Sequence, residues 1–176
     1  MDAVKENGGS AGTKPFLAAV SGVKNSGKTT FLTHLVTELK KRGYRVAVIK
    51  HDGHEFEADV EGTDSWKMKQ AGAYGTAVFS KGQWMVIKQE PGMEESRLAE
   101  LFPEADFILL EGFKYSGYPK FEVVREGNSD KSVCDKGTLL GLVTDTELKI
   151  DGVPRLGMED WEQAADILEK YRQETS

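Results

Sequence analysis

Runs of apolar residues alternate along this chain with segments whose apolar residues recur at helical spacing. Residues 16–21, 44–49 and 107–110 are short, mostly apolar runs, which is typical of strands buried in a parallel sheet. Between the first two runs lies a segment with one apolar helical face, which ends before Gly43 and is formed by Phe31, Leu32, Leu35, Val36 and Leu39. This order predicts two parallel strands joined by a right-handed helical crossover.

The remaining elements follow from the same patterns and from turn residues. Thr63 or Asp64 caps a short helix that runs to about Ala71, and Lys81-Gly82 is a hairpin turn between two strands. The expected strands of this part are residues 76–80, 84–89, 120–125 and 139–143, and the expected helices are residues 94–102 and 158–172. Strands alternating with helices predict an α/β fold of three layers, with a mostly parallel, doubly wound sheet and an inserted β-hairpin.

Length and composition fit one domain and limit the class of protein. The chain has 176 residues, 39% of them apolar, and we expect residues 15–176 to form a single domain after a disordered, glycine-rich lead-in at residues 1–14. A formal net charge of -6 disfavours nucleic-acid binding. The single cysteine, Cys134, excludes an intrachain disulfide and a cysteine-based metal site. Without an apolar leader or a run long enough to span a bilayer, the sequence predicts a cytoplasmic protein with no membrane partner.

A phosphate-binding motif lies between the first strand and the first helix. Residues 22–29 fit the pattern G-x-x-x-x-G-K-[ST], in which glycines allow backbone N–H groups to point at phosphate oxygens. Lys28 supplies a cation for the β- and γ-phosphates, and the Thr29 hydroxyl is a candidate ligand of Mg²⁺. The helix dipole adds to the attraction. The expected nucleotide contacts are Gly22, Asn25, Ser26, Gly27, Lys28, Thr29 and Thr30, and the pattern in this position predicts a P-loop NTPase fold.

A carboxylate for the same metal is expected at the tip of a neighbouring strand. Glu111 directly follows the buried run of residues 107–110, and Gly112 leaves room beside it. P-loop enzymes more often have Asp at this position. We predict that Thr29 and Glu111 are ligands of the metal ion, and that Lys28 and Glu111 are the catalytic residues of any hydrolysis.

Two further positions leave alternatives open. The loop after the second strand gathers histidines and carboxylates, which are His51, Asp52, His54, Glu55 and Asp59. This composition fits contact with the γ-phosphate side of the ligand or with a second substrate, a weak metal site, or a solvated loop. Asp145 follows a strand and can accept hydrogen bonds from the N1–H and N2–H₂ groups of guanine, which adenine lacks. An Asp after a strand is also a common turn residue.

In order and spacing, four motifs resemble those of the molybdopterin-guanine dinucleotide biosynthesis protein B (MobB) family. They are residues 22–30, 49–54, 59–65 and 110–114, and residues 71–73 and 118–120 fit as well, so that the resemblance covers about residues 15–145. The resemblance implies a homodimeric adapter that binds GTP, hydrolyses it slowly at most, and assists the guanylyltransferase that joins GMP to molybdopterin. It further implies that His51, His54, Asp59 and Asp64 face the ligand. Molybdopterin is an additional candidate ligand.

Two other P-loop functions compete with this interpretation. Small-molecule kinases usually gather arginines in a lid around the transferred phosphoryl group, whereas Arg97, Arg125 and Arg155 are scattered along this sequence. Partitioning ATPases resemble K-G-G-x-G-K-[ST], and Val23 occupies the place of their additional lysine. The kinase is the stronger of the two alternatives.

Overall fold

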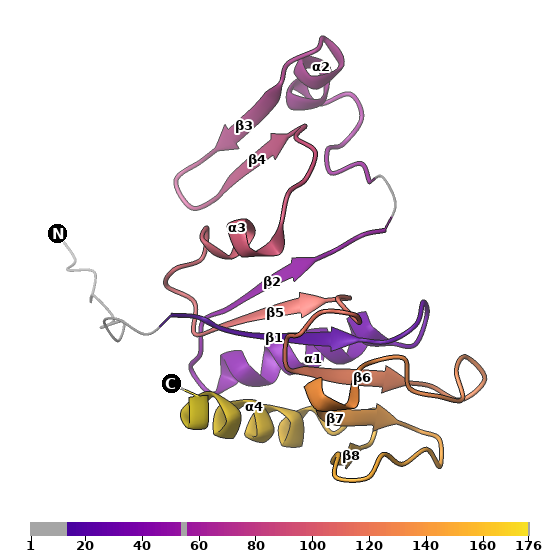
Figure 1. Cartoon of the computed structure of the whole chain (residues 1–176). Helices are drawn as coiled ribbons and strands as arrows, with labels where there is room; N and C mark the ends of the chain where they lie inside the picture. Colours follow the sequence, from indigo (N-terminus) through magenta and orange to yellow (C-terminus); the bar gives the residue numbers. More distant parts are fainter. Residues whose placement is uncertain (1–13, 54–55, 176) are drawn as a thin grey trace, which may run out of the picture. The chain divides into compact units, whose positions relative to one another are not determined.

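The computed structural model describes residues 14–53 and 56–175 (Figure 1). The chain divides into two compact units. The sheet unit contains the described residues up to His51 and from Leu98 onward, and the hairpin unit is Asp52–Arg97. The predicted lead-in lies outside the described residues, apart from Lys14.

The sheet unit is built on six parallel strands. They are β1 (Phe16–Ser21), β2 (Val46–Lys50), β5 (Phe107–Glu111), β6 (Lys120–Val124), β7 (Leu139–Thr144) and β8 (Arg155–Leu156). Their order is β2-β5-β1-β6-β7-β8, so β1 lies between β5 and β6 near the middle of the sheet. This is the predicted α/β fold with a parallel sheet. The two-residue strand β8 was not predicted.

Two helices cover one face of this sheet (Figure 1). They are α1 (Lys28–Lys41) and α4 (Trp161–Thr175). The predicted apolar face of α1 is confirmed, because Phe31, Leu32, Leu35 and Leu39 are buried against strand residues. A short 3₁₀ turn, η1 (Lys136–Thr138), precedes β7.

The opposite face of the sheet has a smaller core. Ala19, Ile49, Ile108 and Leu110 are buried there, and the partly buried residues packed against them include Leu98, Phe102, Phe113 and Tyr118. The helix α3 (Glu95–Ala99) is shorter than the predicted helix over residues 94–102. Residues at the end of α3 and just after it, together with the chain between β5 and β6, therefore pack on this face in place of a long helix.

The hairpin unit contains α2 (Asp64–Gln70), β3 (Gly75–Phe79) and β4 (Trp84–Lys88). Thr63 caps α2 as predicted, since its hydroxyl accepts a hydrogen bond from the Trp66 N–H at 3.3 Å. The antiparallel pair β3–β4 confirms the inserted hairpin. None of the described residues between Asp52 and Arg97 is buried. In the described part of the chain, no helix is both long and apolar enough to cross a membrane.

Candidate functional site

The 22–29 loop joins the carboxyl end of β1 to the start of α1. Gly22, Asn25 and Gly27 have φ values of 140°, 62° and 95°, a region that favours glycine and tolerates asparagine. A Cβ on Gly22 would overlap the carbonyl oxygen of Val123 and lie 2.9 Å from the Ser26 hydroxyl oxygen. The loop can therefore keep this tight course only with glycine at position 22.

The hydroxyl of Ser26 is enclosed by this loop. Ser26 is 0% exposed, and its Oγ has no hydrogen-bond partner among the described residues. A buried hydroxyl without a partner costs free energy of about 1–3 kcal/mol. The loop thus holds a polar atom that a phosphate oxygen can satisfy, which is the first sign that a phosphate fits here.

The ammonium of Lys28 lies over the loop. Its Nζ donates a hydrogen bond to the Val23 carbonyl oxygen at 2.6 Å. Burial lowers the pKa of Lys28; the carboxylate of Glu111 opposes this shift, and the positive charges of Lys114 and Lys50 add to it. The site therefore concentrates positive charge around the motif lysine.

Thr29 and Glu111 form the predicted pair of oxygen ligands. Val20, two residues before the loop, is in register with Glu111 on the neighbouring strand β5. The Thr29 Oγ1 donates to the Glu111 Oε1 at 2.8 Å, and the Lys50 Nζ lies 3.6 Å from that same oxygen. Hydroxyl and carboxylate oxygens are the hard ligands that Mg²⁺ prefers. The donor set therefore fits Mg²⁺ in company with phosphate oxygens. Thr30, also predicted to contact nucleotide, is exposed on the first turn of α1.

His51 lies at the carboxyl end of β2, close to the carboxylate strand. Its backbone N–H donates to the Glu111 carbonyl oxygen at 3.2 Å, and its ring meets that of Phe113 edge to face at 5.6 Å between centroids. His51 is exposed and therefore accessible to a ligand. His54 lies outside the described residues.

Glu55 also lies outside the described residues, and the remaining acidic residues of this stretch belong to the hairpin unit. Asp64 begins α2, is exposed, and lies 3.5 Å from the Lys67 ammonium. Asp59 accepts hydrogen bonds from the hydroxyls of Thr63 and Ser65, both at 3.1 Å. Asp59 thus holds the start of α2. Among the described residues, no group of three His, Cys, Asp or Glu side chains is placed to hold a metal ion.

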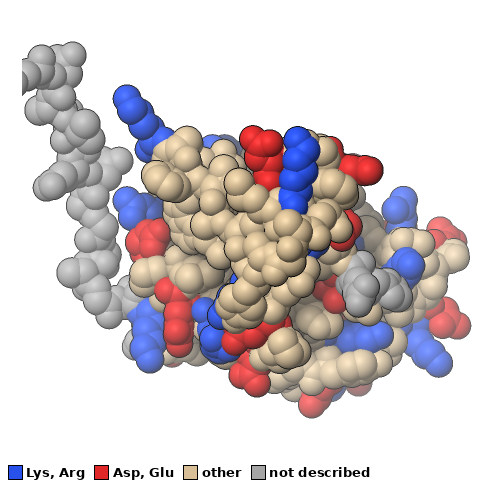
Figure 2. Space-filling view, turned by 90° about the horizontal axis from the view of Figure 1, so that it is seen from above, with Lys and Arg blue, Asp and Glu red and all other residues tan. Residues whose placement is uncertain are grey.

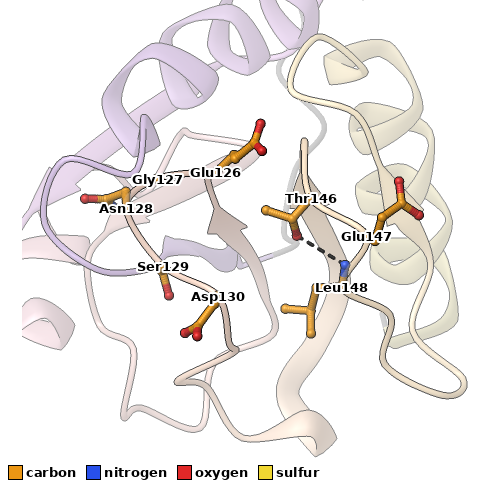
Figure 3. Close-up of a pocket in the computed structure, with 8 residues that line it drawn as sticks. All are labelled: Glu126, Gly127, Asn128, Ser129, Asp130, Thr146, Glu147 and Leu148. Atoms are coloured by element: carbon orange, nitrogen blue, oxygen red, sulfur yellow. Dashed lines mark hydrogen bonds between the residues drawn. The ribbon is translucent and has the colours of Figure 1, made fainter.

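Asp145 directly follows β7 and precedes Thr146, which is one of the residues that line an open pocket (Figure 3). The pocket has a volume of about 550 Å³, and two chain segments face each other across it, residues 126–130 and 146–148. Asp145 Oδ1 accepts a hydrogen bond from the Glu126 backbone N–H at 2.7 Å, which ties these two segments together. Asn128 Nδ2 donates to the carbonyl oxygen of Lys24 at 3.0 Å, so the pocket adjoins the 22–29 loop.

The pocket is acidic. Glu126, Asp130 and Glu147 line it, and none of its described lining residues is lysine or arginine. Carboxylates accept hydrogen bonds and repel phosphate. The pocket is therefore suited to the hydrogen-bond donors of a ligand whose phosphates lie on the neighbouring loop.

Sequence reasoning missed several charged groups near the 22–29 loop. Lys50 and Lys114 lie close enough to affect the charge of Lys28, and the Nη1 of Arg125 lies 3.9 Å from the position that a Cβ on Gly27 would occupy. Lys114 and Arg125 follow β5 and β6, the two strands that neighbour β1. Lys50 is the last residue of β2, the strand next to β5. That position is the signal that could have found them.

Comparisons with known proteins identify one family of relatives. The sequence pattern of the family described as "Molybdopterin guanine dinucleotide synthesis protein B" matches residues 17–145. A molybdopterin-guanine dinucleotide biosynthesis adapter protein from Haemophilus influenzae is 34% identical over 158 residues, which are 88% of each chain. The adapter protein of that name from Escherichia coli is 33% identical over 165 residues, or 89% of this chain and 93% of the relative.

Solved structures of MobB proteins share the fold of this chain. Bacillus subtilis MobB has a TM-score of 0.70 at 29% identity, covering 88% of this chain and 96% of its own. A MobB homolog from Bacillus stearothermophilus has a TM-score of 0.68 over 89% of this chain and 97% of its own, and at 22% identity it supports the fold alone. With a family pattern spanning most of the sequence and relatives covered almost end to end, the chain belongs to the MobB family.

Proposed function

We propose that this protein binds GTP together with Mg²⁺ on the 22–29 loop and acts as an adapter in the biosynthesis of molybdopterin guanine dinucleotide. The observation that carries the nucleotide part is the loop itself, whose positive-φ glycines enclose a Ser26 hydroxyl that has no hydrogen-bond partner in the described part of the chain. The adapter role is supported by the names of the curated relatives, which are matched over about nine-tenths of this chain.

In the proposed complex, different groups of the site bind different parts of the ligand. The backbone N–H groups and the dipole of the 14-residue helix α1 attract the phosphates, and Lys28 adds a mobile cation. Thr29 and Glu111 would hold Mg²⁺. When bound, the ion would neutralise charge on the phosphate oxygens.

The guanine part of the ligand is proposed to occupy the acidic pocket beside Asp145. Guanine presents N1–H and N2–H₂ as adjacent donors, and the pocket offers several carboxylates and no described cation. Asn128 joins the pocket wall to the 22–29 loop, so base and phosphates would lie on neighbouring segments. This arrangement would favour GTP over ATP.

Hydrolysis is proposed to be slow. Among the described arginines, Arg125 lies beside the 22–29 loop, Arg97 belongs to the hairpin unit, and the Arg155 Nη2 donates to the Thr146 carbonyl oxygen at 2.5 Å. A site that binds the ground state well and gathers few groups for the transition state turns over slowly. Such a site suits an adapter better than a fast GTPase.

The protein is proposed to be a homodimer that associates through the hairpin unit. One face of β3–β4 is apolar and open, with Phe79 85%, Trp84 60% and Val86 57% exposed. Figure 2 shows uncharged residues forming a continuous area on the displayed face, between scattered charged side chains. An isolated two-stranded hairpin is at best marginally stable in water, so a second copy that covers this face and pairs with an open edge would stabilise both.

A pair of substitutions separates this surface from the nucleotide site. Phe79→Ser with Trp84→Ser should convert the dimer to a monomer in analytical ultracentrifugation and leave GTP affinity within about twofold. The matched control is Leu101→Ser, an apolar residue of the sheet unit that is 51% exposed. A wild-type monomer at all protein concentrations would contradict the proposed dimer.

The partner enzyme is proposed to be the molybdopterin guanylyltransferase, and molybdopterin is a further candidate ligand of the complex. The test is reconstitution of the dinucleotide cofactor from purified transferase, molybdopterin, molybdate and limiting GTP, with and without this protein. We expect a higher yield with the protein and association in a pull-down, both weakened by Lys28→Ala. Equal yields without association would contradict the adapter role, and rapid GTP hydrolysis or a phosphorylated metabolite would favour an enzyme instead.

A further inference from the structure

The chain between β5 and β6 crosses β1, the strand that leads into the 22–29 loop. Because β5 and β6 lie on opposite sides of β1, residues 112–119 must pass over it to connect them. The Gly112 N–H donates to the Val20 carbonyl oxygen at 3.0 Å, and the Ala19 N–H donates to the Pro119 carbonyl oxygen at 2.9 Å. Both ends of this crossing loop are therefore fixed to β1.

A buried lysine holds the crossing loop in one conformation. Lys120 is 0% exposed, and its Nζ donates to the carbonyl oxygens of Ser116 at 2.6 Å, Phe113 at 3.0 Å and Lys114 at 3.4 Å. Phe113 has a φ of 52°, which a residue other than glycine adopts only when its surroundings impose it. Burial lowers the pKa of Lys120, so placing this ammonium costs free energy that a purely local turn would not require.

The loop held in this way carries a third lysine to the phosphate site. Lys114 lies two residues beyond Gly112, whose N–H is bonded to Val20 just before the 22–29 loop, and the charges of Lys114 and Lys50 both act on the Lys28 ammonium. Three ammonium groups and one carboxylate leave excess positive charge, which is unfavourable unless an anion neutralises it. The ammonium of Lys114 lies 4.9 Å from the centroid of the exposed Tyr115 ring, a weak cation–π contact that a phosphate can replace.

We propose that Lys114 is a direct ligand of the terminal phosphate of the bound nucleoside triphosphate, and that Lys120 is the residue that positions it. This inference rests on the proposed nucleotide binding and adds to it a preference for the triphosphate over the diphosphate. The motif lysine contacts both the β- and the γ-phosphate, so Lys28 by itself does not separate a triphosphate from a diphosphate. Lys114, delivered from the crossing loop to the terminal phosphate alone, distinguishes the two nucleotides.

The test compares the affinities for GTP, GDP and inorganic tripolyphosphate, each with Mg²⁺, by isothermal titration calorimetry. Lys114→Ala should weaken GTP binding by about tenfold or more, since a charge-assisted contact is lost, and GDP binding by less than about threefold. The control is Lys170→Ala on α4, whose side chain is 78% exposed, and it should change neither affinity.

The role of Lys120 needs a readout that misfolding alone would not produce. Lys120→Met should lower the ratio of GTP to GDP affinity, and combining it with Lys114→Ala should lower the ratio no further, because both changes act through one contact. If Lys120→Met does not fold, the Lys114→Ala result decides the proposal alone.

The possible failures point to different parts of the account. Wild-type protein that binds neither GTP nor tripolyphosphate would contradict the proposed nucleotide function. Wild-type protein that binds GTP, with Lys114→Ala lowering GTP and GDP affinity equally or not at all, would overturn the role of Lys114 and leave that function standing. A Lys114→Ala variant with a lower ratio of GTP affinity to GDP affinity than the wild type, and an unchanged melting temperature, would support the inference.

Discussion

The sheet unit and the hairpin unit contrast sharply in what they bury. In the sheet unit, β5 and β6 are buried along their whole length, and both faces of the sheet carry a core. In the hairpin unit, none of the described residues is buried, and large side chains such as Phe79 and Trp84 are open to solvent. One region therefore holds its polar groups in fixed positions by packing, whereas the other has the character of a surface that needs a partner.

The contrast explains where the candidate ligand residues gather. Rigid placement of a phosphate site requires strands and helices that do not shift when a charge arrives. Lys28, Thr29 and Glu111 all stand at the ends of elements packed into the core of the sheet unit. Asp64, by contrast, is exposed on the short helix of the hairpin unit.

The largest effect should come from removing a core side chain of the sheet unit. Leu35→Ala on α1, where the side chain is 0% exposed, should lower the free energy of unfolding by about 2–5 kcal/mol. The matched change in the hairpin unit is Met68→Ala on α2, where the side chain is 59% exposed, and it should cost less than about 0.5 kcal/mol. Urea unfolding measures both. Equal losses would contradict the comparison.

Loss of the motif lysine should give the next largest effect. Lys28→Ala should weaken GTP binding by about 10- to 100-fold, because it removes a charge-assisted contact worth about 1.5–3 kcal/mol. Fluorescence titration with a labelled GTP measures this change. A folded variant with an unchanged dissociation constant would show that the 22–29 loop does not hold the phosphates.

A smaller and more selective effect is expected at the strand tip. Glu111→Gln removes the charge but keeps an oxygen that can accept from the Thr29 hydroxyl, so the fold should be preserved. The enhancement of GTP binding by Mg²⁺ should fall by about tenfold, since an anionic oxygen ligand is lost. Calorimetry with and without Mg²⁺ provides the measurement. Equal enhancement in both proteins would remove Glu111 from the metal site.

The smallest effect should concern the base. Asp145→Asn can still accept the Glu126 N–H through its side-chain carbonyl oxygen, so the pocket should remain intact. GTP affinity should fall by roughly 0.5–1 kcal/mol, and xanthosine triphosphate should be relatively favoured, because its 2-carbonyl can accept from the Asn amide. Competition titrations with both nucleotides would reveal this. An unchanged preference would place the guanine contact elsewhere in the pocket.

Much of the fold was predictable because local signals agreed with the packing. The unbroken apolar run at β1 and the helical spacing of Phe31, Leu35 and Leu39 each correspond to a buried surface. The capping residue Thr63 was also predicted, since its side chain acts on backbone three residues away. The strand β8 was missed because two residues show no alternation.

The candidate site was less completely predictable because lysines have no characteristic spacing when tertiary structure brings them together. Lys120 reads in sequence as an ordinary surface residue, yet it is fully buried against carbonyl oxygens of the crossing loop. Lys50 and Glu111 are far apart in sequence and lie side by side because β2 and β5 are neighbours in the sheet. The acidic pocket likewise depends on two loops joined by a hydrogen bond from the Glu126 backbone N–H to the Asp145 carboxylate.

The central claim is that the sheet unit of this protein binds GTP with Mg²⁺. The most direct measurement is a calorimetric titration of the wild-type protein with GTP and with ATP, each with and without Mg²⁺. The account predicts the tightest binding for GTP with Mg²⁺, weaker binding when either Mg²⁺ is left out or ATP replaces GTP, and a stoichiometry of one nucleotide per chain. Absence of GTP binding, or ATP bound as tightly as GTP under both conditions, would contradict it.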